Sequence, residues 1–129
     1  MNTSYYANMR RLPKDSNFVS IAGFAPDWYK ERQYKILAPK LWFFKQFKED
    51  KNVKKYIAIY YKEVLAKLDP QKVLQDLGND AILLCYEVPQ RFCHRHVVAA
   101  WLNKKLDLGV KEIGEEQIRS FVETSKMPY

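Results

Sequence analysis

The sequence predicts one Rossmann-like α/β domain over residues 1–129, built as three layers with a short, mostly parallel central sheet and helices on both faces. Segments of strand composition alternate with segments of helical periodicity, which is typical of such sandwiches. Residues 81–86 are continuously apolar, as expected for a central strand covered on both faces. The 129 residues are 47% hydrophobic and 15% aromatic, which suits one compact domain and argues against intrinsic disorder.

In the first half of the chain we expect two strands followed by two helices. Strands are predicted over Asn2–Ala7 and Phe18–Phe24, which are rich in β-branched and aromatic residues and precede turn residues. Helices are predicted over residues 40–49 and 53–68, because apolar residues recur there at spacings of three and four. The apolar stripe expected on the first helix is Leu41, Phe44 and Phe47.

In the second half, helices and strands alternate. Asp69 followed by Pro70 predicts an N-cap and a proline at the first helical position, in a short helix that ends at Gly78. Four further elements follow: a strand over Ala81–Tyr86, a helix over Cys93–Lys105, a strand over Val110–Ile113 and a helix over Glu115–Thr124. Strands separated by helices imply right-handed crossovers and a parallel sheet.

The apolar runs, the cysteine count and the net charge limit the classes of protein to which this chain can belong. No apolar run reaches the roughly 20 residues of a membrane span, and the first residues lack the pattern of a signal peptide, so we expect a cytoplasmic protein without a membrane partner. Two cysteines are too few for a disulfide scaffold. The net charge of +7 is concentrated in residues 28–67, which carry eleven basic and four acidic residues.

This basic segment also contains many aromatic residues, and the mixture has two interpretations. Lysines that neutralise phosphates beside rings that stack on bases would form a nucleic-acid surface, with Lys54 and Lys55 as candidate contacts. Alternatively, the rings face the core and the lysines cover the solvent side of ordinary amphipathic helices.

The most concentrated chemistry lies in residues 85–96, where both cysteines, both histidines, an acid and two arginines occur within 12 residues. This segment follows the predicted central strand, and open α/β sheets bind ligands beyond the carboxyl ends of their strands. On a helical projection His94 faces the sheet, Arg95 lies at the border of the buried stripe and His96 points outward. Arg95 is therefore a candidate anion contact. His94 is either a catalytic or a satisfied structural histidine, and His96 is a surface residue within reach of Cys93.

Cys93 is a candidate nucleophile, because a helix N-terminus beside histidine and arginine favours the thiolate. Cys85, which follows two leucines, is expected to be a buried packing residue, and Glu87 is the nearby acid that can move protons. The spacing from cysteine to arginine does not match enzymes that cradle an oxyanion between these residues. No CxxC pair is present, and His94 and His96 diverge by about 200°, so we predict neither a metal site nor a cofactor.

The segments Leu83–Glu87 and Phe92–His96, with the helix that follows, resemble the family named domain of unknown function four-eight-eight. Its Cys-x-Glu and Cys-His-Arg motifs correspond to Cys85, Glu87 and residues 93–95, and Thr3–Asn8 resembles the start of its members. The resemblance implies an α/β domain in which Ser4 and Cys85 converge with these residues. Many members carry a histidine in the first strand, where this chain has Tyr5-Tyr6-Ala7.

Two functional hypotheses follow. In the first, the protein binds or acts on an anionic ligand, such as a nucleotide or nucleic-acid component, at the end of the central strand. Cys93, His94 and Glu87 would then be catalytic, while Arg95, Ser4, Cys85 and His96 would contact the ligand. In the second, it is a non-enzymatic factor that grips nucleic acid or an acidic protein through residues 28–67. The oligomeric state does not follow from the sequence.

Overall fold

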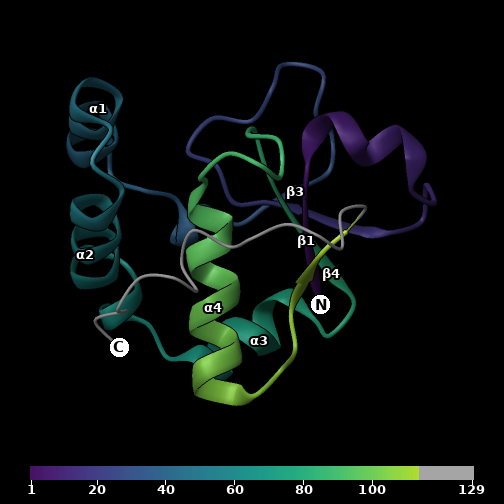
Figure 1. The fold of residues 1–129 in the computed structure, drawn as a ribbon. Helices are drawn as coiled ribbons and strands as arrows, with labels where there is room; N and C mark the ends of the chain where they lie inside the picture. Colours follow the sequence, from purple (N-terminus) through teal and green to yellow (C-terminus); the bar gives the residue numbers. More distant parts are fainter. Residues whose placement is uncertain (114–129) are drawn as a thin grey trace.

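The computed structural model describes residues 1–113 and contains a five-stranded parallel sheet in the order β3-β2-β4-β1-β5 (Figure 1). Every pairing in the sheet is parallel, which agrees with the prediction of a mostly parallel sheet. The expected helix at 115–124 lies outside the described residues. The strands are β1 (Asn2–Tyr5), β2 (Asn17–Ser20), β3 (Arg32–Gln33), β4 (Ala81–Cys85) and β5 (Lys111–Glu112).

The central strand β4 is buried along its whole length, and its alternating side chains enter two different cores. Ala81 and Leu83 belong to a larger core on one face of the sheet, whereas Ile82 and Leu84 belong to a smaller core on the other. Successive side chains of a strand point to opposite faces, so a strand that is covered on both faces must be apolar throughout.

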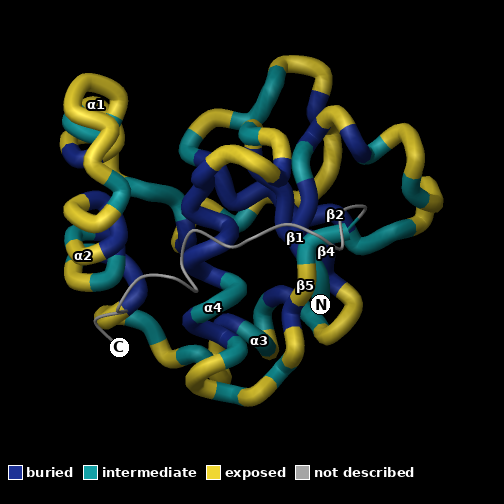
Figure 2. The backbone as a smooth tube through the Cα atoms, viewed as in Figure 1, coloured by how far each residue is buried: buried dark blue, intermediate teal, exposed yellow. Residues whose placement is uncertain are grey.

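Helices cover both faces of the sheet, which confirms the three-layer prediction. The larger core is formed with residues of α2, α3 and α4, and the smaller core with Tyr6 of η1. Figure 2 shows α4 largely buried in the middle of the molecule. The α-helices are α1 (Leu41–Asp50), α2 (Val53–Glu63), α3 (Pro70–Leu77) and α4 (His94–Leu106). The 3-10 helices are η1 (Tyr6–Arg11), η2 (Lys35–Leu37) and η3 (Leu65–Lys67).

The first two strands are shorter than predicted, and buried polar contacts are found where each of them ends. β1 ends at Tyr5, and in η1 the side-chain amide of Asn8 donates a hydrogen bond back to the hydroxyl of Ser4 at 3.1 Å. β2 ends at Ser20, whose hydroxyl is hydrogen-bonded to that of Tyr6 at 2.5 Å. Both features depend on tertiary contacts that strand propensity does not describe.

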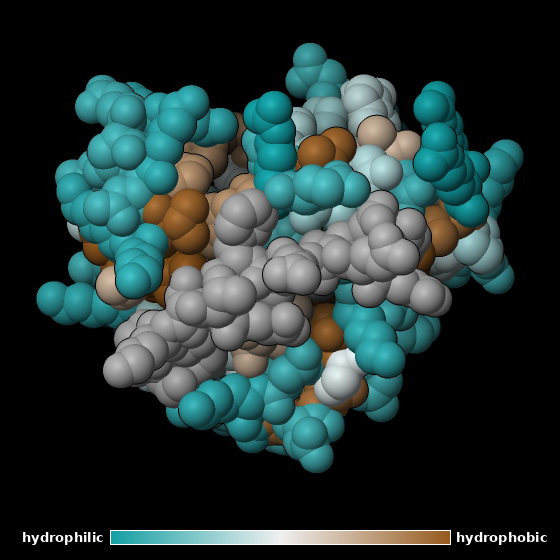
Figure 3. All heavy atoms as spheres, viewed as in Figure 1, coloured by the Kyte–Doolittle hydropathy of each residue, from teal (hydrophilic) through white to brown (hydrophobic). Residues whose placement is uncertain are grey.

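The predicted apolar stripe of α1 was wrong at Leu41 and Phe44, but it was confirmed at Phe47, which is partly buried and packs against the larger core. Phe43 is the buried residue of this helix, and it packs against Tyr56 of α2 with ring centroids 5.6 Å apart, whereas Leu41 and Phe44 are exposed. α1 is therefore buried on the side that faces α2. Leu41 and Phe44 lie outside this buried side, so both remain available to line a pocket. Hydrophilic side chains cover much of the outer surface of α1 and α2 (Figure 3).

The strand β3 was missed, because its two exposed residues, Arg32 and Gln33, leave no apolar pattern in the sequence. It is fixed by tertiary contacts instead. The Arg32 guanidinium donates to the carbonyl oxygen of Leu77 at 2.8 Å, at the end of α3, and Tyr29 donates to the carbonyl of Arg32 at 2.7 Å.

No helix within residues 1–113 is long and apolar enough to cross a membrane.

Candidate functional site

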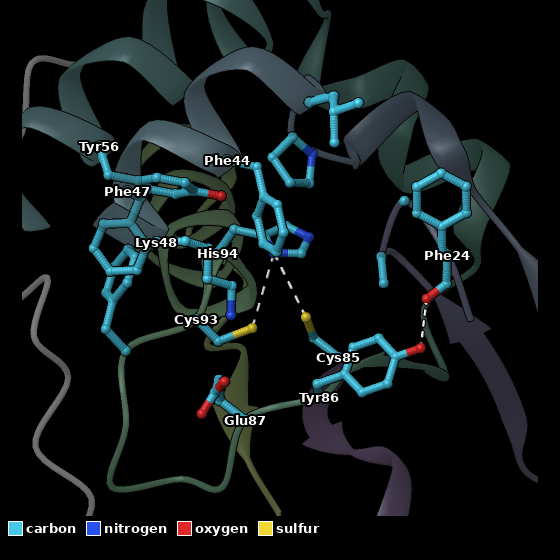
Figure 4. A pocket seen from close by; sticks show the side chains of 15 residues that line it. Phe24, Phe44, Phe47, Lys48, Tyr56, Cys85, Tyr86, Glu87, Cys93 and His94 are labelled. Atoms are coloured by element: carbon cyan, nitrogen blue, oxygen red, sulfur yellow. Dashed lines mark hydrogen bonds between the residues drawn. The ribbon is translucent and has the colours of Figure 1, made fainter. Parts of the chain in front are cut away.

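A pocket of about 330 Å³ opens at the carboxyl end of β4, between the start of α4 and the helices α1 and α2 (Figure 4). Its position agrees with the general rule for ligand sites in α/β sheets. The residues that line it come from five separate segments of the chain: Ala22, Gly23, Phe24, Pro39, Leu41, Phe44, Phe47, Lys48, Tyr56, Cys85, Tyr86, Glu87, Phe92, Cys93 and His94.

The loop between β4 and α4 brings the two cysteines together. β4 ends at Cys85, and Cys93, in extended backbone conformation, is the N-cap of α4. Phe92 anchors the end of this loop against α1 and α2, with its ring centroid 5.6 Å from Phe47 and 5.4 Å from Tyr56. The strand end and the helix start are thereby held on the floor of one pocket.

Cys85, Cys93 and His94 form a compact cluster, and all three side chains are buried. The Nδ1 atom of His94 lies 3.6 Å from the sulfur of Cys85 and 3.8 Å from the sulfur of Cys93. Figure 4 shows both sulfur atoms directed toward the imidazole ring. The three donor atoms lie within 4.8 Å of one another, so among the described residues this group can hold a metal ion.

The orientation of His94 is fixed by a second contact. Its Nε2 lies 2.7 Å from the carbonyl oxygen of Ile21, just beyond β2. A carbonyl can only accept, so Nε2 carries a proton, and Nδ1, which faces the sulfurs, accepts from a thiol in the neutral ring and donates to a thiolate in the imidazolium. The buried position predicted for His94 is confirmed.

The two thiols differ in acidity because they share a hydrogen bond. The bond to Cys93 and burial raise the pKa of Cys85 well above its usual value. Burial alone would raise the pKa of Cys93, but hydrogen bonds from Cys85 and His94 and the charges of His94 and Arg95 outweigh it and hold this pKa well below the usual value. Cys85 therefore acts as the donor and Cys93 as the thiolate of the pair.

Arg95 does not contact the pocket. Its side chain is fully buried, and Nε and Nη2 donate to the two carboxylate oxygens of Glu112 at 3.0 and 2.9 Å. The predicted anion contact is instead occupied by a carboxylate of the protein itself. A helical projection alone does not reveal that an edge strand carrying an acid packs at this point of α4.

His96 is buried rather than exposed as predicted. Its Nε2 lies 3.2 Å from the carbonyl oxygen of Arg91, in the loop that precedes α4. Burial and the nearby charge of Arg95 lower the pKa of His96. The loop that precedes α4 contacts the side of the helix that was expected to face solvent, and His96 does not line the pocket.

Of the remaining candidate residues, Glu87 lines the pocket, whereas Ser4, Lys54 and Lys55 do not. Glu87 is half-buried and lines the pocket, as the first hypothesis requires. Ser4 is fully buried, receives the hydrogen bond from Asn8 and is not a lining residue. Lys54 and Lys55 are exposed on α2, and Lys55 is paired with Asp50 at 3.3 Å.

Sequence reasoning missed the aromatic and cationic wall of the pocket. Phe44 and Lys48 of α1 lie one turn apart, with the Lys48 amino group 5.1 Å from the centre of the Phe44 ring. On the other side, the Tyr86 hydroxyl donates to the carbonyl of Phe24 at 2.6 Å. The helix over residues 40–49 was predicted correctly, and the exposure of Phe44 on that helix could have indicated this wall. Such an inference requires knowing which face of α1 is buried.

Residues 5–106 match the family described as "Active DUF488-N3 subclade". No curated protein and no solved structure matches the chain. The match covers most of the sequence and confirms the resemblance noted from the two cysteine motifs. The protein belongs to the DUF488-N3a family, the active DUF488-N3 subclade.

Proposed function

We propose that the protein binds a small anionic ligand that carries a ring, of which a nucleotide is the expected type, and acts on it at the carboxyl end of β4. One observation carries the proposal: Cys85, Cys93 and His94 form the floor of a pocket with an aromatic wall. The volume of about 330 Å³ lies at the lower end of the range for small-molecule sites.

The wall suits a planar ring. Phe44 and Leu41 are exposed on the pocket side of α1, and Phe47 and Phe92 continue the apolar surface toward the floor. Large exposed hydrophobic side chains around a concave site are typical of ligand surfaces. A base or similar ring that stacks on Phe44 would exclude water from the floor.

Lys48 supports an anionic group on the ligand. It lines the pocket from α1, and its amino group points into the pocket in Figure 4. The anion contact first assigned to Arg95 moves to Lys48 in this proposal, because Arg95 is engaged by Glu112. The basic surface of residues 28–67, to which Lys48 belongs, would attract the anionic ligand over a longer range.

The floor supplies the chemistry. Cys93 and His94 are the candidate reacting groups, and Glu87, which lines the same pocket, is the candidate for moving protons. The description of the family as an active subclade favours an enzyme over a passive binder. Both cysteines are free, and the proposed chemistry needs them reduced, as they would be in the cytoplasm.

The test is isothermal titration of the reduced protein with the four common ribonucleoside monophosphates, the matching nucleosides and inorganic phosphate. We expect at least one nucleotide to bind. Lys48→Ala should weaken nucleotide binding about tenfold and leave the nucleoside unaffected, because it removes one charged contact. Phe44→Ala should weaken both. Lys45→Ala, an exposed lysine of the same helix, is the matched control.

Binding of none of these compounds to the wild-type protein would refute the proposal, as would equal losses in the Lys45 and Lys48 variants. Turnover is followed by mass spectrometry of any nucleotide that binds. Glu87→Gln should leave binding intact and slow product formation. Unchanged turnover in this variant would exclude Glu87 from the reaction.

The alternative proposal, a nucleic-acid or acidic-protein surface on residues 28–67, is supported by exposed Lys54. Part of the positive charge is balanced locally, because Lys55 pairs with Asp50, and Lys40 and Lys67 pair with Glu63. Charge reversal of Lys54 and Lys55 should weaken binding of single-stranded oligonucleotides, with a steep loss between about 50 and 200 mM salt. Salt-insensitive binding that survives the double reversal would favour the pocket.

A further inference from the structure

The Cys85–Cys93–His94 cluster has the composition and the spacing of a metal site. Two sulfurs and one imidazole nitrogen are donors that Zn²⁺ prefers, whereas Mg²⁺ and Ca²⁺ require oxygen donors. The three donor atoms come from the end of β4 and the start of α4, and they lie within 4.8 Å of one another. The positions of these elements in the fold, rather than a CxxC spacing, bring the donors together.

The two nitrogen–sulfur distances of the cluster agree with those of a tetrahedron around zinc. Bonds of about 2.3 Å to sulfur and about 2.0 Å to nitrogen at tetrahedral angles place sulfur and nitrogen roughly 3.5 Å apart. Nδ1 of His94 lies 3.6 Å from the sulfur of Cys85 and 3.8 Å from the sulfur of Cys93. Shifts of a few tenths of an ångström would bring these two nitrogen–sulfur distances to the tetrahedral value.

The contacts of His94 prepare it to be a ligand. Nε2 is committed to the carbonyl oxygen of Ile21 at 2.7 Å, which leaves Nδ1 free to coordinate. Histidines that bind metals commonly donate their other ring N–H to a backbone carbonyl, which fixes both the tautomer and the ring orientation. The ring is held further by Tyr60, at 5.6 Å between centroids in an edge-on arrangement.

We propose that Cys85, Cys93 and His94 bind one Zn²⁺ ion through two thiolates and Nδ1, with the fourth tetrahedral position open to the pocket. On binding, the cluster releases two protons to solvent, one from the Cys85 thiol and one shared by Cys93 and His94, and the two resulting thiolates neutralise the dication. Three protein ligands with one open position are typical of catalytic rather than structural zinc. The inference goes beyond the proposed function, because Cys93 and His94 become metal ligands in place of reacting groups, and it holds whether or not the pocket takes a nucleotide.

A Zn²⁺ ion bound at this site would act as the electrophile of the pocket. A ligand atom or a water molecule in the fourth position would lie beside the aromatic wall and within the pocket that Glu87 lines. Zinc lowers the pKa of a bound water, and an adjacent carboxylate can accept its proton. The two cysteines would then hold the ion, and the reacting oxygen would come from water or from the ligand.

The test is a titration of the reduced, chelator-treated 129-residue protein with Co²⁺, which reports coordination by its absorption spectrum. We expect one equivalent to bind, with thiolate-to-cobalt charge-transfer absorption in the near ultraviolet and intense visible bands of four-coordinate cobalt. Zn²⁺ should displace the cobalt. Cys85→Ser and Cys93→Ser should each remove about half of the charge-transfer intensity, because each removes one of two thiolates.

His96→Gln is the matched control, since His96 is the other histidine of the chain and lies outside the cluster. It should leave the cobalt spectrum unchanged, whereas His94→Gln should weaken binding. A measurement on the wild-type protein avoids any folding defect of the variants: Zn²⁺ should slow alkylation of both cysteines by iodoacetamide, and a chelator should restore it. Unchanged alkylation, or a spectrum without thiolate charge transfer, would overturn the site.

Azide tests the open position. It should change the visible bands of the cobalt protein by occupying the fourth site, and unaltered bands would refute an accessible position. The two proposals can fail separately. A thiolate-cobalt spectrum without nucleotide binding would remove the proposed function alone, and nucleotide binding without metal uptake would remove the zinc site alone.

Discussion

Arg95 of α4, whose side chain is fully buried, is held by Glu112 of the edge strand β5 in a two-pronged ion pair, with contacts of 3.0 and 2.9 Å. The hydroxyl of Thr3 in β1 donates to the same carboxylate at 2.6 Å. The pair therefore joins the helix that carries His94 to two strands of the sheet. The Nη1 atom of Arg95 has no hydrogen-bond partner within the described residues, so the guanidinium depends on Glu112.

Removal of the carboxylate should be strongly destabilising. Glu112→Ala leaves a buried guanidinium without its partner, and we expect a loss of about 3–5 kcal/mol in the free energy of unfolding, measured by urea denaturation. Glu112→Gln should cost less, because its amide oxygen still accepts one hydrogen bond. Lys111→Ala, at an exposed position of the same strand, is the control and should change stability by about 0.5 kcal/mol or less. Equal effects at positions 111 and 112 would contradict a stabilising pair.

The sequence predicted those parts of the fold that local signals determine. The continuous apolar run identified β4, and the Asp69-Pro70 pair correctly located the start of α3, where the Asp69 carboxylate accepts from the Gln71 amide at 3.0 Å. Parallel pairing and three layers followed from the alternation of elements. Exposed β3 carries no such signal, because a two-residue edge strand is fixed by its neighbours.

The candidate site was predicted only in part, because only some of its residues are brought together by local features of the sequence. Cys85, Glu87, Cys93 and His94 are close in sequence and lie at one strand end, so their convergence could be anticipated. The roles of Arg95 and His96 depend on what packs against α4 from elsewhere, which a helical projection does not contain. The expectation that no metal binds rested on the absence of a CxxC pair and on the divergence of His94 and His96, and it stays a prediction. Neither argument considers donors that a strand end and a helix start bring together.

Gly78, at the end of α3, should not tolerate a side chain. Its φ of +93° is a conformation that L-residues rarely adopt, and an added Cβ would lie 3.3 Å from the carboxylate of Asp80. We expect Gly78→Ala to lower the free energy of unfolding by about 1–3 kcal/mol. Gly23→Ala is the matched control, because its Cβ would meet nothing within 4 Å. Urea denaturation of both variants checks the difference, and similar losses would argue against strain at Gly78.

The N-cap of α3 should contribute measurably to stability. Asp69→Ala removes the acceptor for the Gln71 amide and should cost about 0.5–2 kcal/mol by urea denaturation. Asp69→Asn should retain most of the stability, because an amide oxygen also caps a helix. If the alanine and asparagine variants were equally destabilised, charge rather than capping would be the cause.

Acid should weaken the attachment of α3 to the segment before η2. The Asp76 carboxylate accepts from Lys72 at 2.8 Å and from the Tyr34 hydroxyl at 2.7 Å, and these two hydrogen bonds lower the pKa of Asp76. A carboxyl whose pKa is lower in the folded state contributes stability above its unfolded pKa of about 3.9 and loses it as the pH falls through the folded value. Asp76→Asn should therefore lower Tm at pH 7, and the difference from wild type should shrink below about pH 4. Asp15→Asn, at an exposed turn position, should alter Tm little at either pH, and a gap for Asp76→Asn that stays constant with pH would contradict the ionic contribution.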